Sequence, residues 1–400
     1  MTPSKKKLPV LFWVHGGSQI VSFGSAASKV GDVHKLIRDS AGNETPIIVV
    51  SVQYRLNIFH VGDGNSNKNL GFKDLQCAVE WVREHIAGFG GDPDEITIAG
   101  ESAGAALTHA LVVAGAQVKR AIIMSGSLHM SPPQPETRAR IAIIQPVLEV
   151  LKTRGYHELK TAPASEVIEA MVDVSIKSVF LQADGELADW SVKTGNIQEL
   201  IIGDVQKESV LFSNGIRDMS LRQVFEAFDK AGQSAQLLKT LYHVKDGRPN
   251  AARQGALDFL NDRLWGLPVW TIADRFREQG KKVYTYIFDQ ANPWQWSAGA
   301  HHAVDLIFLF GGFNLAHDAG AFKLSADMRR RFALFLNGEE PWSADKTCAF
   351  GPCGQVQEIS AEEVSYRRRM LNYSQLRKIP PADLAAVTTA LAAGKISLHV

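Results

Sequence analysis

A serine lies at the centre of the pattern Gly-x-Ser-x-Gly, which spans residues 100–104. The residues before it, 95–100, predict a buried strand, and the small-residue run that opens at Ala103 predicts a helix. A strained strand-to-helix turn of this kind exposes the serine hydroxyl at the helix N-terminus, where backbone N–H groups and the helix dipole favour a developing negative charge. The pattern therefore predicts that Ser102 is a nucleophile in acyl transfer.

A second glycine-containing element, His15-Gly16-Gly17-Ser18, directly follows an apolar strand predicted over residues 8–15. Acyl transfer needs hydrogen-bond donors placed where the carbonyl oxygen becomes an oxyanion, and backbone beside glycine can approach closely. The backbone N–H groups of Gly17, Ser18 and Ala103 are the predicted donors. A simple glycine turn remains the alternative for this element.

The elements that must position these residues alternate between short apolar runs and helical patterns, which is typical of a parallel sheet wrapped by helices. A helix is predicted over 71–87, with Leu75, Val79, Val82 and Ile86 on one apolar stripe. A helical block is predicted over 221–279 and a last helix over 326–336, followed by a tail that contains Pro and Gly. The predicted strands span 8–15, 47–54, 95–100, 120–125, 200–205 and 283–289.

Composition excludes several classes of protein. The 400 residues are 45% hydrophobic and carry a net charge of +1, so no basic field argues for a nucleic-acid partner. The uncharged stretch 103–118 is short for a membrane span. Cys77 is predicted to be buried in a helix, whereas Cys348 and Cys353 either close a short loop or stay free.

Several segments together resemble the type B carboxylesterases, the esterases related to liver carboxylesterases and cholinesterases. They are the strand followed by His-Gly-Gly, Ser-Val-Gln-Tyr-Arg at 51–55, Glu-Trp-Val-Arg-Glu-His-Ile at 80–86, Phe-Gly-Gly-Asp-Pro at 89–93, and residues 100–104. The resemblance implies an α/β-hydrolase fold with a mostly parallel central sheet and helical insertions. It also implies a serine carboxylesterase that acts on small-molecule esters without a cofactor or a metal.

The same resemblance implies a Ser–Glu–His order for the catalytic triad. Glu208, which follows the strand 200–205, matches the acid, with Asp204 as the nearest rival. His302 matches the base, with the adjacent His301 as the alternative.

Two further residues match supporting positions of the family: Glu101 beside the nucleophile, and Ser125 near the histidine. A structural salt bridge is the alternative for Glu101. Cell-adhesion members of the family lose the serine, so a non-catalytic recognition module is the rival hypothesis. The presence of Ser102, Glu208 and His302 favours an enzyme.

The resemblance further implies one domain over 1–400 that lacks the family's N-terminal strands, with helical insertions at 128–199 and 210–280 that line the pocket. The strand 47–54 would then lie at an edge of the sheet, where its apolar run favours self-association unless another segment covers it. No signal peptide is visible. The sequence as it stands indicates a cytoplasmic protein, a longer N-terminus would allow secretion, and the oligomeric state is open.

Overall fold

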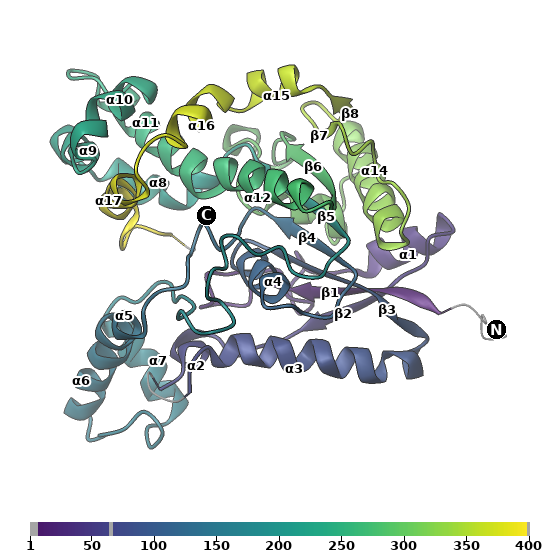
Figure 1. The fold of residues 1–400 in the computed structure, drawn as a ribbon, viewed down its shortest axis with the longest axis horizontal. Coiled ribbons are helices and arrows are strands. Elements are labelled where there is room, and N and C mark those ends of the chain that lie inside the picture. The colour runs from purple at the N-terminus through teal and green to yellow at the C-terminus, as the bar shows by residue number, and fades with distance from the viewer. Residues whose placement is uncertain (1–6, 64–66, 398–400) are drawn as a thin grey trace.

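The computed structural model describes residues 7–63 and 67–397 and contains a sheet of eight strands in the order β2-β1-β3-β4-β5-β6-β7-β8 (Figure 1). All neighbouring strands pair in parallel except β7 and β8, which pair antiparallel. The mostly parallel sheet and all six predicted strands are confirmed. The strands are β1 (Leu8–Val14), β2 (Ile48–Val52), β3 (Gly91–Glu101), β4 (Arg120–Met124), β5 (Glu199–Val205), β6 (Lys282–Phe288), β7 (Thr347–Phe350) and β8 (Val356–Ile359).

Helices cover both faces of the sheet, because alternate side chains of the inner strands are buried on opposite sides. In β1, Val10, Phe12 and Val14 pack in one core and Leu11 and Trp13 in the other. The first core is covered by α3 (Leu70–His85), α4 (Ala103–Val113) and α12 (Leu267–Glu278). The second is covered by α1 (His34–Gly42), α13 (Val304–Phe310) and α14 (Ala319–Leu336).

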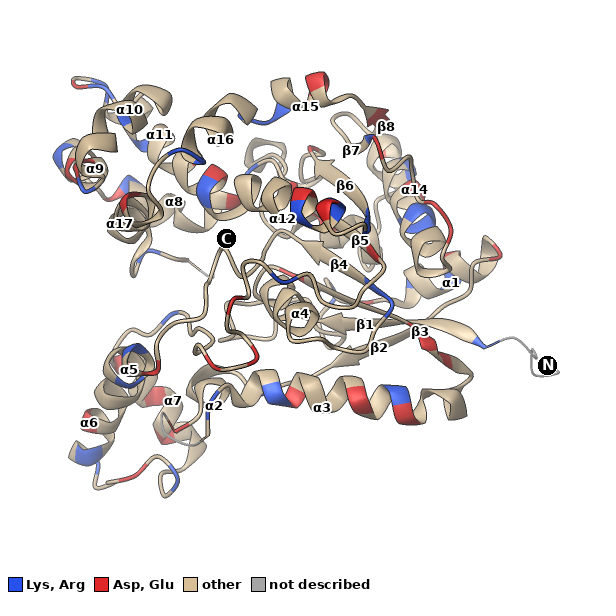
Figure 2. Ribbon diagram, viewed as in Figure 1, with Lys and Arg blue, Asp and Glu red and all other residues tan. Residues whose placement is uncertain are grey.

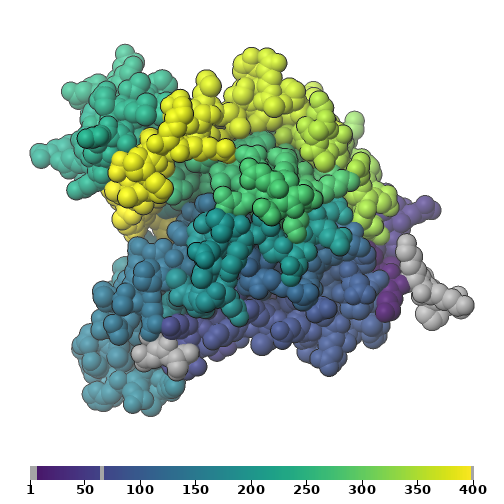
Figure 3. Space-filling view, viewed as in Figure 1, coloured from purple at the N-terminus to yellow at the C-terminus, as the bar shows by residue number. Residues whose placement is uncertain are grey.

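Two further helical blocks lie beyond the carboxyl ends of the strands, one below the other in Figures 1 and 3. We call the first the lower block: α2 (Asn57–Val61), α5 (Glu136–Ala139), α6 (Gln145–Thr153) and α7 (Ala164–Asp173) share one apolar core. The upper block shares another, and consists of α8 (Ser213–Arg217), α9 (Leu221–Asp229), α10 (Ala235–Leu241), α11 (Pro249–Asn261), α16 (Met370–Leu376) and α17 (Pro381–Ala392). The remaining helix is α15 (Ala361–Arg367), and short 3-10 or π turns span Ile86–Phe89, Arg140–Ile144, Glu208–Phe212, Gly232–Ser234, Asp262–Gly266 and Trp296–Ala298.

The structure corrects the prediction for the region after the sixth strand. Helix α14 begins at Ala319, well before 326, because the side chain of Asp318 accepts a hydrogen bond from the N–H of Ala321 and caps the helix. The predicted tail instead contains β7, β8 and three helices. Each of the two strands has four residues, which is too short for a recognisable alternating pattern.

The cysteine predictions have mixed outcomes. Cys77 is exposed and not buried, because it lies on the face of α3 opposite the confirmed apolar stripe. Cys348 is buried in β7 and Cys353 is exposed. Both thiols are free, so the two cysteines do not close the short loop.

Charged residues lie mainly on the outer helices and connecting segments, whereas the strands are largely uncharged (Figure 2). Strand β2 is an edge strand, since it pairs only with β1 among the described residues and all five of its residues are partly exposed. Within the described ranges, no helix is both long and apolar enough to cross a membrane.

Candidate active site

Ser102 lies at the turn between β3 and α4, at the carboxyl edge of the sheet. Its backbone has φ 58° and ψ −122°, and its N–H donates to the carbonyl oxygen of Met124 at 2.9 Å. The small residues of the pentapeptide are needed for close packing, because a Cβ at Gly104 would lie 2.2 Å from the carbonyl oxygen of Val14. The turn is therefore strained and held by its neighbours, as a nucleophile elbow requires.

The structure brings Ser102, Glu208 and His302 together from three separate parts of the chain. The Nε2 atom of His302 lies 2.8 Å from Oγ of Ser102, and its Nδ1 atom lies 2.5 Å from Oε2 of Glu208. Glu208 is fully buried, while Ser102 and His302 are 8% and 9% exposed. The hydroxyl, imidazole and carboxylate thus form one continuous chain of hydrogen bonds.

Backbone contacts fix the segments that carry Glu208 and His302. The N–H of His302 donates to the carbonyl oxygen of Lys207, and the N–H of Lys207 donates to that of Ala300 at 2.9 Å. The second carboxylate oxygen of Glu208 accepts from the N–H of Val205 at 2.9 Å. The Glu208 carboxylate is therefore held from both sides, by its own strand end and by the histidine.

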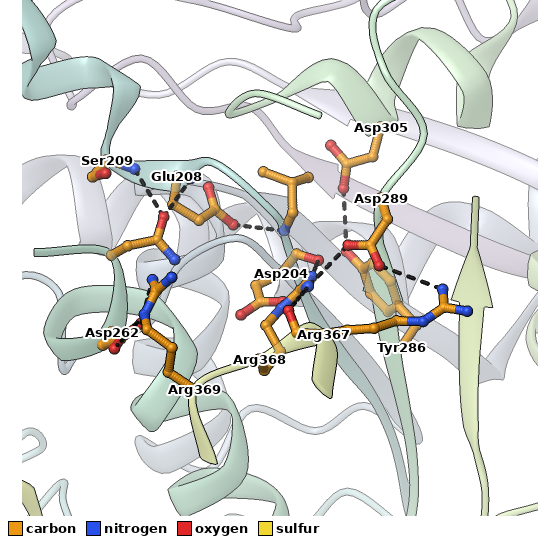
Figure 4. Close-up of polar contacts among 12 residues, drawn as sticks. Asp204, Glu208, Ser209, Asp262, Tyr286, Asp289, Asp305, Arg367, Arg368 and Arg369 are labelled. Carbon is orange, nitrogen blue, oxygen red and sulfur yellow. Dashed lines mark hydrogen bonds and ion pairs between the residues drawn. The ribbon is translucent and has the colours of Figure 1, made fainter. Parts of the chain in front are cut away.

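Asn261, at the end of α11, adds a contact that the sequence analysis did not identify. Its buried Oδ1 accepts the N–H groups of Glu208, at 2.8 Å, and Ser209, at 3.2 Å. These two donors open the turn at Glu208 and lie close together in Figure 4. Because an unsatisfied buried N–H is costly, Asn261 stabilises the conformation of the acid segment.

Asp204 and His301, the alternatives to Glu208 and His302 in the sequence analysis, have other hydrogen-bond partners. Asp204 accepts from Nε of Arg368 at 2.9 Å, and the same guanidinium bonds Asp289 at 2.8 Å, as the centre of Figure 4 shows. Burial raises the pKa of Asp204 to about 6, although Arg368 opposes the shift. The ring of His301 contacts Asn292 and the carbonyl oxygen of His302. In the part of the chain that the structure describes, neither Asp204 nor His301 is hydrogen-bonded to Ser102.

The His-Gly-Gly element after β1 packs directly against the serine turn. A Cβ at Gly16 would lie 2.7 Å from the carbonyl oxygen of Glu101 and 3.2 Å from Cβ of Ser102, so only glycine permits this approach. Ser18 and Ala103 line the same cavity as Ser102, whereas Gly17 is not among the described residues that line it. Ser18 has a left-handed φ of 56°.

His302 is surrounded by buried carboxylates. Oε1 of Glu101 lies 3.2 Å from its Nε2 atom, on the side of the serine. Burial alone would lower the pKa of His302, but the charges of Glu101, Glu208 and Asp305 outweigh it and raise that pKa to about 9. Burial also raises the pKa of Glu101 to about 8 and that of Asp305 to about 7. The site therefore stabilises an imidazolium at His302.

Ser125, predicted as a supporting residue, is fully buried after β4. Its carbonyl oxygen accepts from Nε1 of Trp265 at 2.9 Å, and the Trp265 ring meets the His302 ring edge-on with centroids 5.8 Å apart. Among the described residues, its Oγ has no hydrogen-bond partner. A supporting role for the Ser125 hydroxyl stays a prediction.

Comparison with known proteins identifies the family. The family model described as "Carboxylesterase family" matches residues 1–372. The chain is 26% identical to "Lipase 3" of Yarrowia lipolytica, over 96% of this chain and 78% of that protein. It is 28% identical to "Carboxylesterase 5A" of Felis catus, over 84% and 67%.

The chain belongs to the carboxylesterase family. As a member it is a carboxylic ester hydrolase, which confirms the sequence prediction of an enzyme. The carboxylesterase also matches a solved structure of "PNB esterase" with a TM-score of 0.73 at 23% identity, over 91% of this chain and 82% of that one. This likeness, with the eight-stranded sheet, confirms the α/β-hydrolase fold.

A cavity of about 500 Å³ opens at Ser102 between the lower and upper helical blocks. Its lining includes Ile143 and Phe180 from the segment 128–199, and Leu211 and Trp265 from the segment 210–280. These are the two segments that the sequence analysis predicted as pocket walls. A further part of the wall comes from the end of α17 and the residues just beyond it: Thr388, Thr389, Ala392, Ala393, Gly394 and Ile396.

Proposed function

We propose that this carboxylesterase hydrolyses esters through a covalent acyl-enzyme on Ser102, with His302 as general base and Glu208 as the acid that orients it. The observation that carries the proposal is the 2.8 Å contact between Nε2 of His302 and Oγ of Ser102, together with the 2.5 Å contact of Nδ1 with Glu208. These contacts follow the triad arrangement, in which a base lies within hydrogen-bond reach of the nucleophile and a third group orients the base.

In the first half-reaction, Nε2 of His302 accepts the proton of Ser102 as Oγ bonds to the ester carbonyl carbon. Glu208 accepts the hydrogen bond of Nδ1–H and stabilises the imidazolium that forms. The carbonyl oxygen becomes an oxyanion, and the N–H groups of Gly17, Ser18 and Ala103 donate to it. His302 then gives the proton to the leaving alcohol oxygen as the C–O bond breaks.

In the second half-reaction, water replaces the alcohol. His302 accepts a proton from the water as its oxygen attacks the acyl carbon, and the same donors hold the second oxyanion. The Ser102–acyl bond breaks, and the proton on His302 returns to Ser102. The products are the carboxylic acid and the free enzyme.

The experiment is hydrolysis of p-nitrophenyl esters by purified variants. Ser102→Ala and His302→Ala are each expected to lose on the order of 10⁴-fold in kcat, by analogy with serine triads. The matched control is His301→Ala, which changes the adjacent imidazole and is expected to lose far less. Near-normal turnover by Ser102→Ala would refute the mechanism, and a larger loss for His301→Ala than for His302→Ala would reassign the base.

A further inference from the structure

The cavity at Ser102 has an uneven distribution of charge. Apart from small polar and apolar residues, its lining contains two ionisable side chains, Arg138 and Lys177, both basic. No aspartate or glutamate is among the described residues that line it. Glu101 and Glu208 lie behind this surface, fully buried. Any molecule in the cavity therefore meets positive charge and no exposed negative charge.

Neither cation is neutralised by a carboxylate among the described residues. Arg138 donates to Oε1 of Gln134 at 2.6 Å, a neutral acceptor, and its guanidinium lies over the Phe180 ring at 5.7 Å from the centroid. Among the described residues, neither Arg138 nor Lys177 forms an ion pair, whereas Lys152 pairs with Glu149 and Arg154 with Glu166.

Lys177 also lines a second cavity, and that cavity contains an acid. Asp218 lines a neighbouring cavity of about 580 Å³ that Lys177 also reaches, without forming an ion pair with it. Gly394 and Ile396 line both cavities. Lys177 therefore borders both cavities, and it forms no ion pair with a described residue in either of them.

A further part of the cavity wall is built from small side chains. Thr388, Thr389 and Ala392 of α17 face the cavity, while Leu384, Val387 and Leu391 of the same helix pack in the core of the upper block. This wall lies outside residues 1–372, which match the family model. The part of the cavity bounded by Arg138, Lys177 and α17, which we call the remote subsite, is therefore built partly by a segment beyond the family match.

We propose that the remote subsite takes a negatively charged group, so that the preferred substrates are esters that carry a carboxylate, phosphate or sulfate away from the scissile bond. The proposal rests on the proposed function of Ser102. Two cations in a cavity without an exposed acid favour an anion by direct attraction and by charge-assisted hydrogen bonds. The guanidinium of Arg138, with Phe180 beneath it, presents its N–H groups to such an anion.

The test compares mono-p-nitrophenyl esters of the dicarboxylic acids from adipic to sebacic with p-nitrophenyl esters of monocarboxylic acids of the same chain length. The wild type is expected to show a higher kcat/KM for the charged ester at one or more lengths. Arg138→Gln and Lys177→Gln are each expected to lower that preference by about fivefold, the upper range for a partly exposed charge pair. The preference should also fall as salt is raised, because the cations are accessible to solvent.

The matched control is Arg140→Gln, which removes an exposed arginine two positions from Arg138 that does not line the cavity. It should leave unchanged both the ratio of kcat/KM values and the kcat/KM for the neutral esters. An equal ratio in wild type and in the Arg138→Gln/Lys177→Gln double variant would overturn the proposal while leaving ester hydrolysis at Ser102 intact. Failure of the wild type to hydrolyse any ester would instead overturn the proposed function and this inference with it.

Discussion

Replacing Glu101 by glutamine is expected to move the acid limb of the pH–rate profile to lower pH. Only neutral His302 accepts the serine proton, so kcat/KM rises as pH passes upward through the pKa of His302. A carboxylate at position 101 favours the protonated ring and raises that pKa. Glutamine keeps the shape but removes the charge, so the pKa of His302 should fall and activity should persist at lower pH.

The geometry sets the size of the effect. The closest atoms of Glu101 and His302 are 3.2 Å apart, and two full charges at this distance interact by about 5 kcal/mol at an effective dielectric constant of about 20. Burial raises the pKa of Glu101 itself to about 8, so the residue carries its charge for only part of the titration. The net shift of the acid limb is therefore expected to be about one pH unit.

The assay is kcat/KM for a neutral p-nitrophenyl ester from pH 5 to pH 10, because this constant reports ionisations of the free enzyme. Asp305→Asn is the comparison variant. The Asp305 charge also raises the pKa of His302, but it contributes less than the charges of Glu101 and Glu208 do. This variant should shift the limb less than Glu101→Gln does. An acid limb in Glu101→Gln that coincides with the wild-type limb, or lies above it, would refute the electrostatic reasoning.

Four further predictions follow from single features of the structure. Ser18→Gly should change kcat by less than about tenfold, because glycine keeps the backbone N–H and readily adopts the left-handed φ of this position. Loss of an oxyanion donor changes kcat by about 10²–10³, so a rise of two orders of magnitude in the variant would show that the Ser18 N–H is misplaced in the native chain. Asn261→Ala should lower the free energy of unfolding by about 2–4 kcal/mol and reduce kcat, since two buried N–H groups lose their acceptor; unchanged chemical denaturation would contradict this. Ala392→Phe should narrow the cavity and shift the preferred acyl chain to shorter esters, as a p-nitrophenyl ester series will show. Ala385→Phe should not, because Ala385 lies two turns earlier on the same face of α17 and is exposed outside the cavity lining. The edge strand Ile48–Val52 should cause concentration-dependent self-association, measurable by light scattering, and a monomer at every concentration would argue against it.

Site residues that lie in short motifs could be predicted from the sequence around them. The pentapeptide at 100–104 and the His-Gly-Gly element each directly follow a buried strand. For the pentapeptide, the apolar pattern on either side also predicted the strand before it and the helix after it. The serine turn after β3 and the Glu208 segment after β5 lie at the same edge of the sheet because parallel strands end at one edge. Glu208 and His302 themselves depended on the family resemblance.

The contacts that support these residues were not predictable from local sequence. Asn261 reaches Glu208 across 53 positions, and Arg368 reaches Asp204 across 164. Neither residue lies in a motif: Asn261 is a single polar residue in a helical pattern, and Arg368 is the middle of three consecutive arginines, a pattern typical of an exposed surface. The position of α17 against the cavity is likewise decided by packing with the upper block, since its own pattern of small and apolar residues would fit any partly buried helix.

The central claim is that Ser102 is the nucleophile of an assembled triad, and covalent labelling tests it most directly. A fluorophosphonate should add one label per chain to the wild type, as measured by intact mass, and peptide mapping should place it on the segment that contains Ser102. Ser102→Ala should take up no label, and His302→Ala should be labelled far more slowly because the base is missing. Labelling of Ser102→Ala at the wild-type rate, or no labelling of a folded wild type, would contradict the account.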